Sequence, residues 1–144
     1  MLTEADRSVL NEVYKNSRVG MNAIHSIIGK VYDDDLVLDL NRLAYQYAKI
    51  GEKASNKLFE NGLKPETDSP LNKAMMWGSI QLNTLTDIST EHIAELMIQG
   101  STRGMTEMTK SVKDNLTCGK FSMEIARELI DFEEKSIKRL KAYL

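Results

Sequence analysis

The chain contains few of the residue types that carry chemistry, with two histidines and one cysteine among 144 residues. His25 follows Met21 by four residues, which places both on one face of a helix, and Met105 offers a second thioether. Thioether and imidazole groups suit soft copper(I), so a Met/His metal site is one interpretation. The other is an exposed histidine beside core methionines, because the eight methionines suit gap filling. We favour the second interpretation and keep the first as the alternative.

The sequence lacks the patterns typical of enzymes. It has no Gly-x-Ser-x-Gly elbow, no glycine-rich phosphate loop, no zinc-ligand spacing and no dinucleotide-binding fingerprint. Cys118 falls in an expected turn without a histidine nearby in the sequence, so it does not resemble an activated nucleophile. We therefore expect a protein that is not an enzyme and uses no cofactor.

Two parts of the chain carry related patterns. Ser17-x-x-Gly20-Met21 recurs as Ser101-x-x-Gly104-Met105, and Glu52-Lys53 recurs as Glu134-Lys135. Glycine inside a helix costs about 1 kcal/mol relative to alanine, so glycines at matched positions indicate a close approach of helices. The repeat predicts two helical hairpins of similar design.

The serines of this repeat are the polar interruptions of otherwise apolar stripes. In one interpretation, the hydroxyls of Ser17 and Ser101 bond to the preceding turn of their own helices. In the other, they line a small polar cavity in the middle of the bundle together with Ser136 and Glu133. Acid–base chemistry by Glu133 would need a partner that the sequence does not identify.

Apolar residues with helical spacing run along almost the whole chain, and the two prolines, Pro65 and Pro70, lie close together. Because proline removes a backbone donor, this pair marks the break between two helical halves. Asp33 and its two neighbours suit a helix N-terminus, and Ser122 is another candidate cap. We predict one all-α domain over residues 1–144. Its helices are expected at about 4–33, 35–61, 71–84, 89–115 and 122–143, the third being a short crossover helix.

Two antiparallel hairpins joined by a crossover of about 27 residues resemble the ferritin-like superfamily, including rubrerythrin-type domains and small spore-coat-type bundles. The resemblance covers about residues 8–143 and depends on helix lengths, loop lengths and the repeat, not on a specific motif. It implies a ferritin-like four-helix bundle in which the second and third long helices run parallel.

Metal-bearing members of that superfamily use a Glu from each of two helices and Glu-x-x-His from each of the other two. Of the six matching positions here, one holds a carboxylate, so we expect that the dinuclear iron or manganese centre is not retained. A register shifted by one residue would turn Glu52 and Glu134 inward, but no histidine follows either residue three positions later. In helix order, the six positions hold Ser17, then Gly51 and Ala54, then Ser101, then Glu133 and Ser136.

The expected crossover is unusually poor in charge. From Ala74 to Thr90, only Asp87 of 17 residues is charged. This stretch either covers the core of the bundle or forms a surface for self-association or a partner, where Trp and Met are enriched and charge is depleted. The candidate interface residues are Met75, Met76, Trp77 and Ile80.

Composition narrows the class of protein further. Nineteen basic and 21 acidic residues nearly cancel, which argues against a broad surface for nucleic acid or anionic membrane. A single cysteine, no signal-peptide pattern and no apolar run of 18 residues predict a cytoplasmic protein without a disulfide or a membrane span.

The leading hypothesis is therefore a non-enzymatic bundle that acts through self-association, as a homo-oligomer such as a dimer, or through partner binding. The alternative is a metal or small-ligand binding or storage protein. It would use the Met21, His25 and Met105 group or a site in the bundle core around Glu133.

Overall fold

The computed structural model describes residues 1–67 and 85–144, and this part of the chain forms four long helices and no strand. The prediction of an all-α chain is confirmed for these residues. The long helices are α1 (Glu4–Ile27), α2 (Asp34–Glu60), α4 (Thr90–Asp114) and α5 (Lys120–Leu140), with short 3-10 helices η1 (Ile28–Lys30) and η3 (Lys141–Tyr143).

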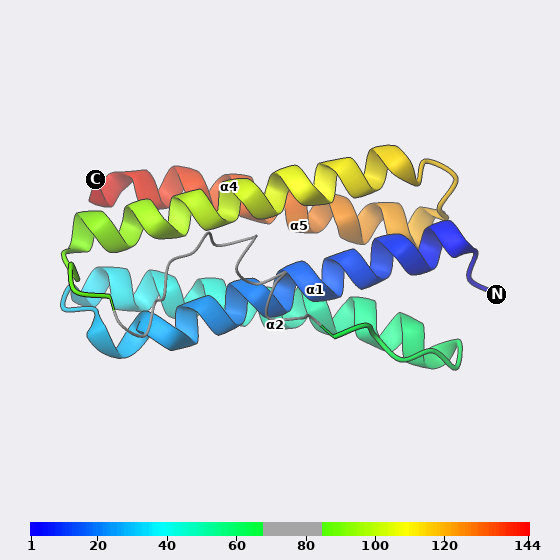
Figure 1. The fold of residues 1–144 in the computed structure, drawn as a ribbon, viewed down its shortest axis with the longest axis horizontal. Helices are drawn as coiled ribbons and strands as arrows, with labels where there is room; N and C mark the ends of the chain where they lie inside the picture. Colours follow the sequence, from blue (N-terminus) through cyan, green and yellow to red (C-terminus); the bar gives the residue numbers. More distant parts are fainter. Residues whose placement is uncertain (68–84) are drawn as a thin grey trace.

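The helices are arranged as two antiparallel hairpins, α1 with α2 and α4 with α5 (Figure 1). α2 ends and α4 begins at opposite ends of the bundle, so these two helices run in the same direction (Figure 1). With 27 residues, α2 alone is about 40 Å long. The predicted crossover helix at 71–84 and the candidate interface residues Met75, Met76, Trp77 and Ile80 lie outside the described residues.

The first helix is shorter than predicted. α1 ends at Ile27 and is followed by η1, whereas a helix to residue 33 was expected. The reason is the next helix, because Asp33 caps α2 in an extended conformation and its carboxylate accepts a hydrogen bond from the Leu36 amide at 2.9 Å. The chain must leave helical geometry before that cap, and Val31 is already extended.

The prediction that Ser122 caps the last helix is wrong. Gly119 occupies the N-cap of α5, and Ser122 is buried in the first turn. Its hydroxyl donates to Oδ1 of Asp6 at 2.8 Å, and the Gly119 amide donates to the same oxygen at 2.7 Å. A carboxylate from α1 thus satisfies the start of α5.

A single core fills the space between the four helices. It is made mostly of aliphatic side chains, and the outer faces of the helices are mainly charged or polar, with a few exposed apolar residues such as Leu38 and Tyr45 of α2. None of the described helices has the length and apolar character needed to cross a bilayer. The largest fully buried residues include Leu10, Ile24, Leu36, Leu40, Ile50, Leu58, Ile93, Met97, Met108, Leu129 and Leu140.

Asp6 connects two parts of the chain that lie far apart in sequence. The Asp6 amide donates a hydrogen bond to the Thr3 hydroxyl. In return, Asp6 Oδ2 accepts hydrogen bonds from the Thr3 amide and hydroxyl, which completes a capping box on α1. Burial alone would raise the pKa of the Asp6 carboxyl, but the hydrogen bonds from Thr3, Gly119 and Ser122 outweigh burial and lower this pKa to about 2. The ionised carboxylate therefore stabilises the junction between α1 and α5.

Replacing Asp6→Ala is expected to lower the free energy of unfolding by about 2–3 kcal/mol at pH 7, because buried donors lose their acceptor. The folded pKa lies below the unfolded value of 3.8, so this stabilisation is present above about pH 4 and is lost as the pH falls towards 2. Urea unfolding followed by circular dichroism between pH 2 and 7 measures the difference.

Glu4→Ala is the matched control, since Glu4 is an exposed acidic residue in the same first turn. Its effect should stay within about 0.5 kcal/mol. Equal effects of the two replacements would contradict the role assigned to Asp6.

Candidate functional site

A polar cluster lies in the middle of the apolar core, with one side chain from each long helix. Its members are Asn16 of α1, Tyr47 of α2, Ser101 of α4 and Glu133 of α5, and all four are at least 96% buried. The Tyr47 hydroxyl donates to Oε2 of Glu133 at 3.0 Å and lies 3.5 Å from the Ser101 hydroxyl. Asn16 Nδ2 donates to the Gly104 carbonyl at 2.8 Å. Each of these contacts joins one hairpin to the other.

Two glycines make room for the large members of this cluster. A Cβ on Gly20 would lie 2.6 Å from the ring of Tyr47, and a Cβ on Gly104 would lie 2.6 Å from Glu133 Oε2. In both hairpins, the glycine of the first helix thus receives a large side chain from the second. The close helix approach predicted from the repeated glycines is confirmed at both positions.

The cluster carries no net charge at neutral pH. Burial raises the pKa of Glu133 from 4.5 to about 8, and the hydrogen bond from Tyr47 lowers this pKa by less. The pKa of Tyr47 is also raised, first by burial and then by the neighbouring Glu133. Glu133 Oε1 has no hydrogen-bond partner within the described residues, whereas Oε2 accepts the hydrogen bond from Tyr47. A neutral carboxyl group avoids the cost of an unpaired buried charge.

The serines singled out in the sequence lie in three different environments. Ser101 belongs to the cluster through Tyr47, whereas the Ser136 hydroxyl donates to the Phe132 carbonyl of its own helix at 2.7 Å. The Ser17 hydroxyl is buried and has no hydrogen-bond partner among the described residues. It lines a hollow of about 270 Å³ between α1 and α2, with Tyr47 beside it.

The possible Met/His ligands are dispersed. His25 is exposed, while Met21 lines the hollow between α1 and α2, which contains neither His25 nor Met105. Over residues 1–67 and 85–144, no three His, Cys, Asp or Glu side chains are grouped in a way that could hold a metal ion. A site with thioether ligands stays a prediction.

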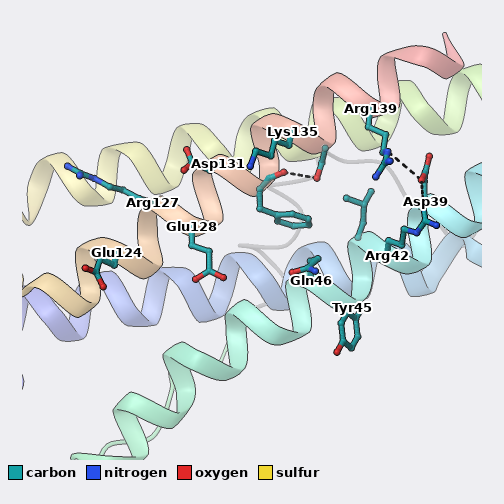
Figure 2. A pocket seen from close by; sticks show the side chains of 13 residues that line it. Asp39, Arg42, Tyr45, Gln46, Glu124, Arg127, Glu128, Asp131, Lys135 and Arg139 are labelled. Atoms are coloured by element: carbon teal, nitrogen blue, oxygen red, sulfur yellow. Dashed lines mark hydrogen bonds and ion pairs between the residues drawn. The ribbon is translucent and has the colours of Figure 1, made fainter.

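A groove of about 790 Å³ runs between α2 and α5 (Figure 2). Its apolar floor contains Leu43 and Phe132, and charged side chains from both helices form its rim. The Phe132 ring packs edge-on against Tyr47, with ring centroids 4.9 Å apart, so the floor of the groove touches the polar cluster. The lining residues are Asp39, Arg42, Leu43, Tyr45, Gln46, Glu124, Arg127, Glu128, Asp131, Phe132, Lys135, Ser136 and Arg139.

Ion pairs fix the two walls of the groove. At one end, Arg139 of α5 lies 3.7 Å from Asp39 of α2 (Figure 2). Tyr143 donates to the same carboxylate at 2.6 Å. Further along, Lys53 donates to both oxygens of Glu128 at 2.8 and 3.0 Å. Between these contacts α2 and α5 pack less closely than the helices within either hairpin, and the groove stays open.

Sequence reasoning identified Glu133 and Ser101 but missed Asn16, Tyr47 and the groove. Tyr47 falls on an apolar stripe of α2, a position that by itself indicates only a core residue. A buried phenol hydroxyl needs a hydrogen-bond partner. Glu133, a polar residue on the apolar face of α5, is the residue that could have indicated this partner. The groove depends on which faces of α2 and α5 meet, and no local pattern specifies that.

The chain matches no family model, and a search of curated proteins finds no similar sequence. Its function is therefore inferred from the polar cluster and the groove.

The folded protein should lose stability as the pH rises from about 5 to about 8. The pKa of Glu133 is about 8 in the folded state and 4.5 when unfolded, so the stabilisation is complete below pH 4.5 and is lost towards pH 8. The replacement Glu133→Gln removes the titration and should make the variant more stable than the wild type at pH 9, by on the order of 3–5 kcal/mol.

Urea unfolding at several pH values measures this difference, with Glu134→Gln as the control because Glu134 is the exposed neighbour. A wild-type curve without the decline, or the same change in both variants, would exclude a neutral Glu133.

Replacing Gly20→Ala is expected to destabilise the fold by about 1–3 kcal/mol despite the better helix propensity of alanine, because the new methyl group overlaps the buried Tyr47 ring. Gly29→Ala is the control, since a Cβ there meets no atom within 4 Å. Thermal unfolding of both variants checks the expectation. A stabilised Gly20→Ala variant would show that the ring does not need this space.

Proposed function

We propose that this protein is a non-enzymatic helical bundle that acts by binding another polypeptide chain in the groove between α2 and α5. The groove itself is the main support. An apolar floor of Leu43 and Phe132, surrounded by charges of both signs, has the composition of a protein interface, with an apolar centre and a polar rim.

An exposed apolar stripe on α2 gives further support. Leu38, Arg42 and Tyr45 follow one another at positions i, i+4 and i+7, so they share a face of α2, and Arg42 and Tyr45 line the groove. Leu38 is 51% exposed and Tyr45 is 61% exposed. Tyrosine and arginine, which Tyr45 and Arg42 supply here, are enriched among the residues that contribute most to binding.

The groove is poorly equipped for catalysis. No histidine or cysteine lines it, and the hydroxyl of its one serine, Ser136, is used by the Phe132 carbonyl. The carboxyl group with the strongly raised pKa, Glu133, lies in the core and is 1% exposed. A substrate in the groove would meet charged and apolar side chains but no nucleophile paired with a base.

The ferritin-like architecture is part of this proposal, as a bundle without the dinuclear centre. The two hairpins and the shared direction of α2 and α4 support it (Figure 1). A Cβ on Gly51 would lie 3.1 Å from the Ser17 side chain, so a side chain in place of Gly51 would crowd α1. A cytoplasmic location, expected from the sequence, belongs to the same proposal.

Photo-crosslinking in cells that make the protein tests whether the groove is occupied. Benzoylphenylalanine in place of Tyr45 is expected to give several times more adduct than the same probe in place of Tyr32. Tyr32 is 80% exposed but lies outside the groove, so it controls for exposure.

A second replacement, Leu38→Glu, should lower the adduct yield at position 45. Equal yields at positions 45 and 32 would contradict binding in the groove.

A further inference from the structure

The charges that line the groove are divided between its two halves. The half nearer the start of α5 has three carboxylates, Glu124, Glu128 and Asp131, against two cations, Arg127 and the Lys53 that pairs with Glu128. The other half has three cations and one carboxylate, which are Arg42, Lys135, Arg139 and Asp39. In Figure 2, Glu124 and Glu128 lie towards one end of the groove and Arg139 towards the other, with Asp131 and Lys135 between them.

Such a division makes the surface complementary to itself in one orientation. A twofold axis perpendicular to α5 reverses the direction of the helix, so the acidic half of one copy faces the basic half of the other, twice. A parallel arrangement would bring like charges together and would be repelled. Partners of uniform charge would fit one half of the groove and be repelled by the other.

We infer that the chain in the groove is a second copy of this protein, with the two α5 helices antiparallel across a twofold axis near Phe132. This inference rests on the proposed function and names its partner. The axis places Asp131 of one copy opposite Lys135 of the other. Within the described residues of one chain, neither side chain forms an ion pair or a hydrogen bond, so both charges are available to the second copy.

The surface available to a second copy extends beyond the groove itself. The lining residues of α5 extend from Glu124 to Arg139, a length of about 23 Å, and the exposed Leu38 and Tyr45 widen the apolar area on α2. A stable interface needs about 800 Å² from each partner, so a second copy must also cover the faces of α2 and α5 that flank the groove. The Glu66 amide donates to Asn11 on α1, so the described chain at this point lies against α1 and not in the groove.

Charge reversal tests the arrangement by sedimentation equilibrium. The wild type should form dimers. Asp131→Lys and Lys135→Glu should each weaken dimerisation at least tenfold, because each creates two contacts between like charges. An equimolar mixture of the two variants, and the double variant D131K/K135E, should dimerise like the wild type. All replacements are exposed and keep good helix formers, so the fold is retained, which circular dichroism verifies.

Two variants with the same changes in charge serve as controls. Glu134→Lys and Lys138→Glu alter exposed residues of α5 that do not line the groove, and both should dimerise normally. A wild type that sediments as one chain at every concentration would overturn the inference. The crosslinking at position 45 would then decide separately whether the groove binds a different protein. Dimers that neither single variant weakens, or that the controls weaken equally, would overturn the antiparallel arrangement.

Discussion

The hydrogen bond from Tyr47 to Glu133 is the contact on which the arrangement of the two hairpins depends. Apolar side chains alone allow helices to slide and rotate past one another with small changes in energy. A buried hydroxyl and a buried carboxyl must meet, because leaving either without a partner costs about 1–3 kcal/mol. The Asn16 bond to the Gly104 carbonyl imposes the same requirement on α1 and α4. Together they specify how the hairpins align.

This alignment also shapes the groove. The Tyr47 ring contacts Phe132 edge-on and fills the space that Gly20 leaves open, so one aromatic side chain touches the core, the polar cluster and the groove floor. Phe132 and Glu133 are neighbours on α5, which means that the turn holding the buried carboxyl also presents the apolar floor. Protonation of Glu133 keeps this turn free of an unpaired charge. The inferred dimer surface is thus built on the part of α5 that the cluster holds in place.

Helix positions could be predicted from the sequence because apolar spacing and capping residues act locally. Asp33 caps α2 as expected, and the repeated glycines mark the closest approaches of the helices. Ser122 shows where a prediction from neighbouring residues fails. Its hydroxyl donates a hydrogen bond to Asp6, which lies 116 residues away in the sequence, and does not cap its own helix. A tyrosine in a helical stripe is expected to be buried, but the stripe does not show whether its hydroxyl has a partner. The position of Tyr47 opposite Glu133 on another helix supplies that partner.

A titration of the Glu133 carboxyl carbon by ¹³C NMR tests the central claim most directly, with Glu133→Gln used to assign the signal. The account predicts a signal that reports the protonated acid at pH 6–7 and titrates with a pKa of about 8. Titration near 4.5, the ordinary value for a glutamate, would show that the carboxyl is ionised in the folded protein. The account of a neutral polar cluster between the hairpins would then be wrong.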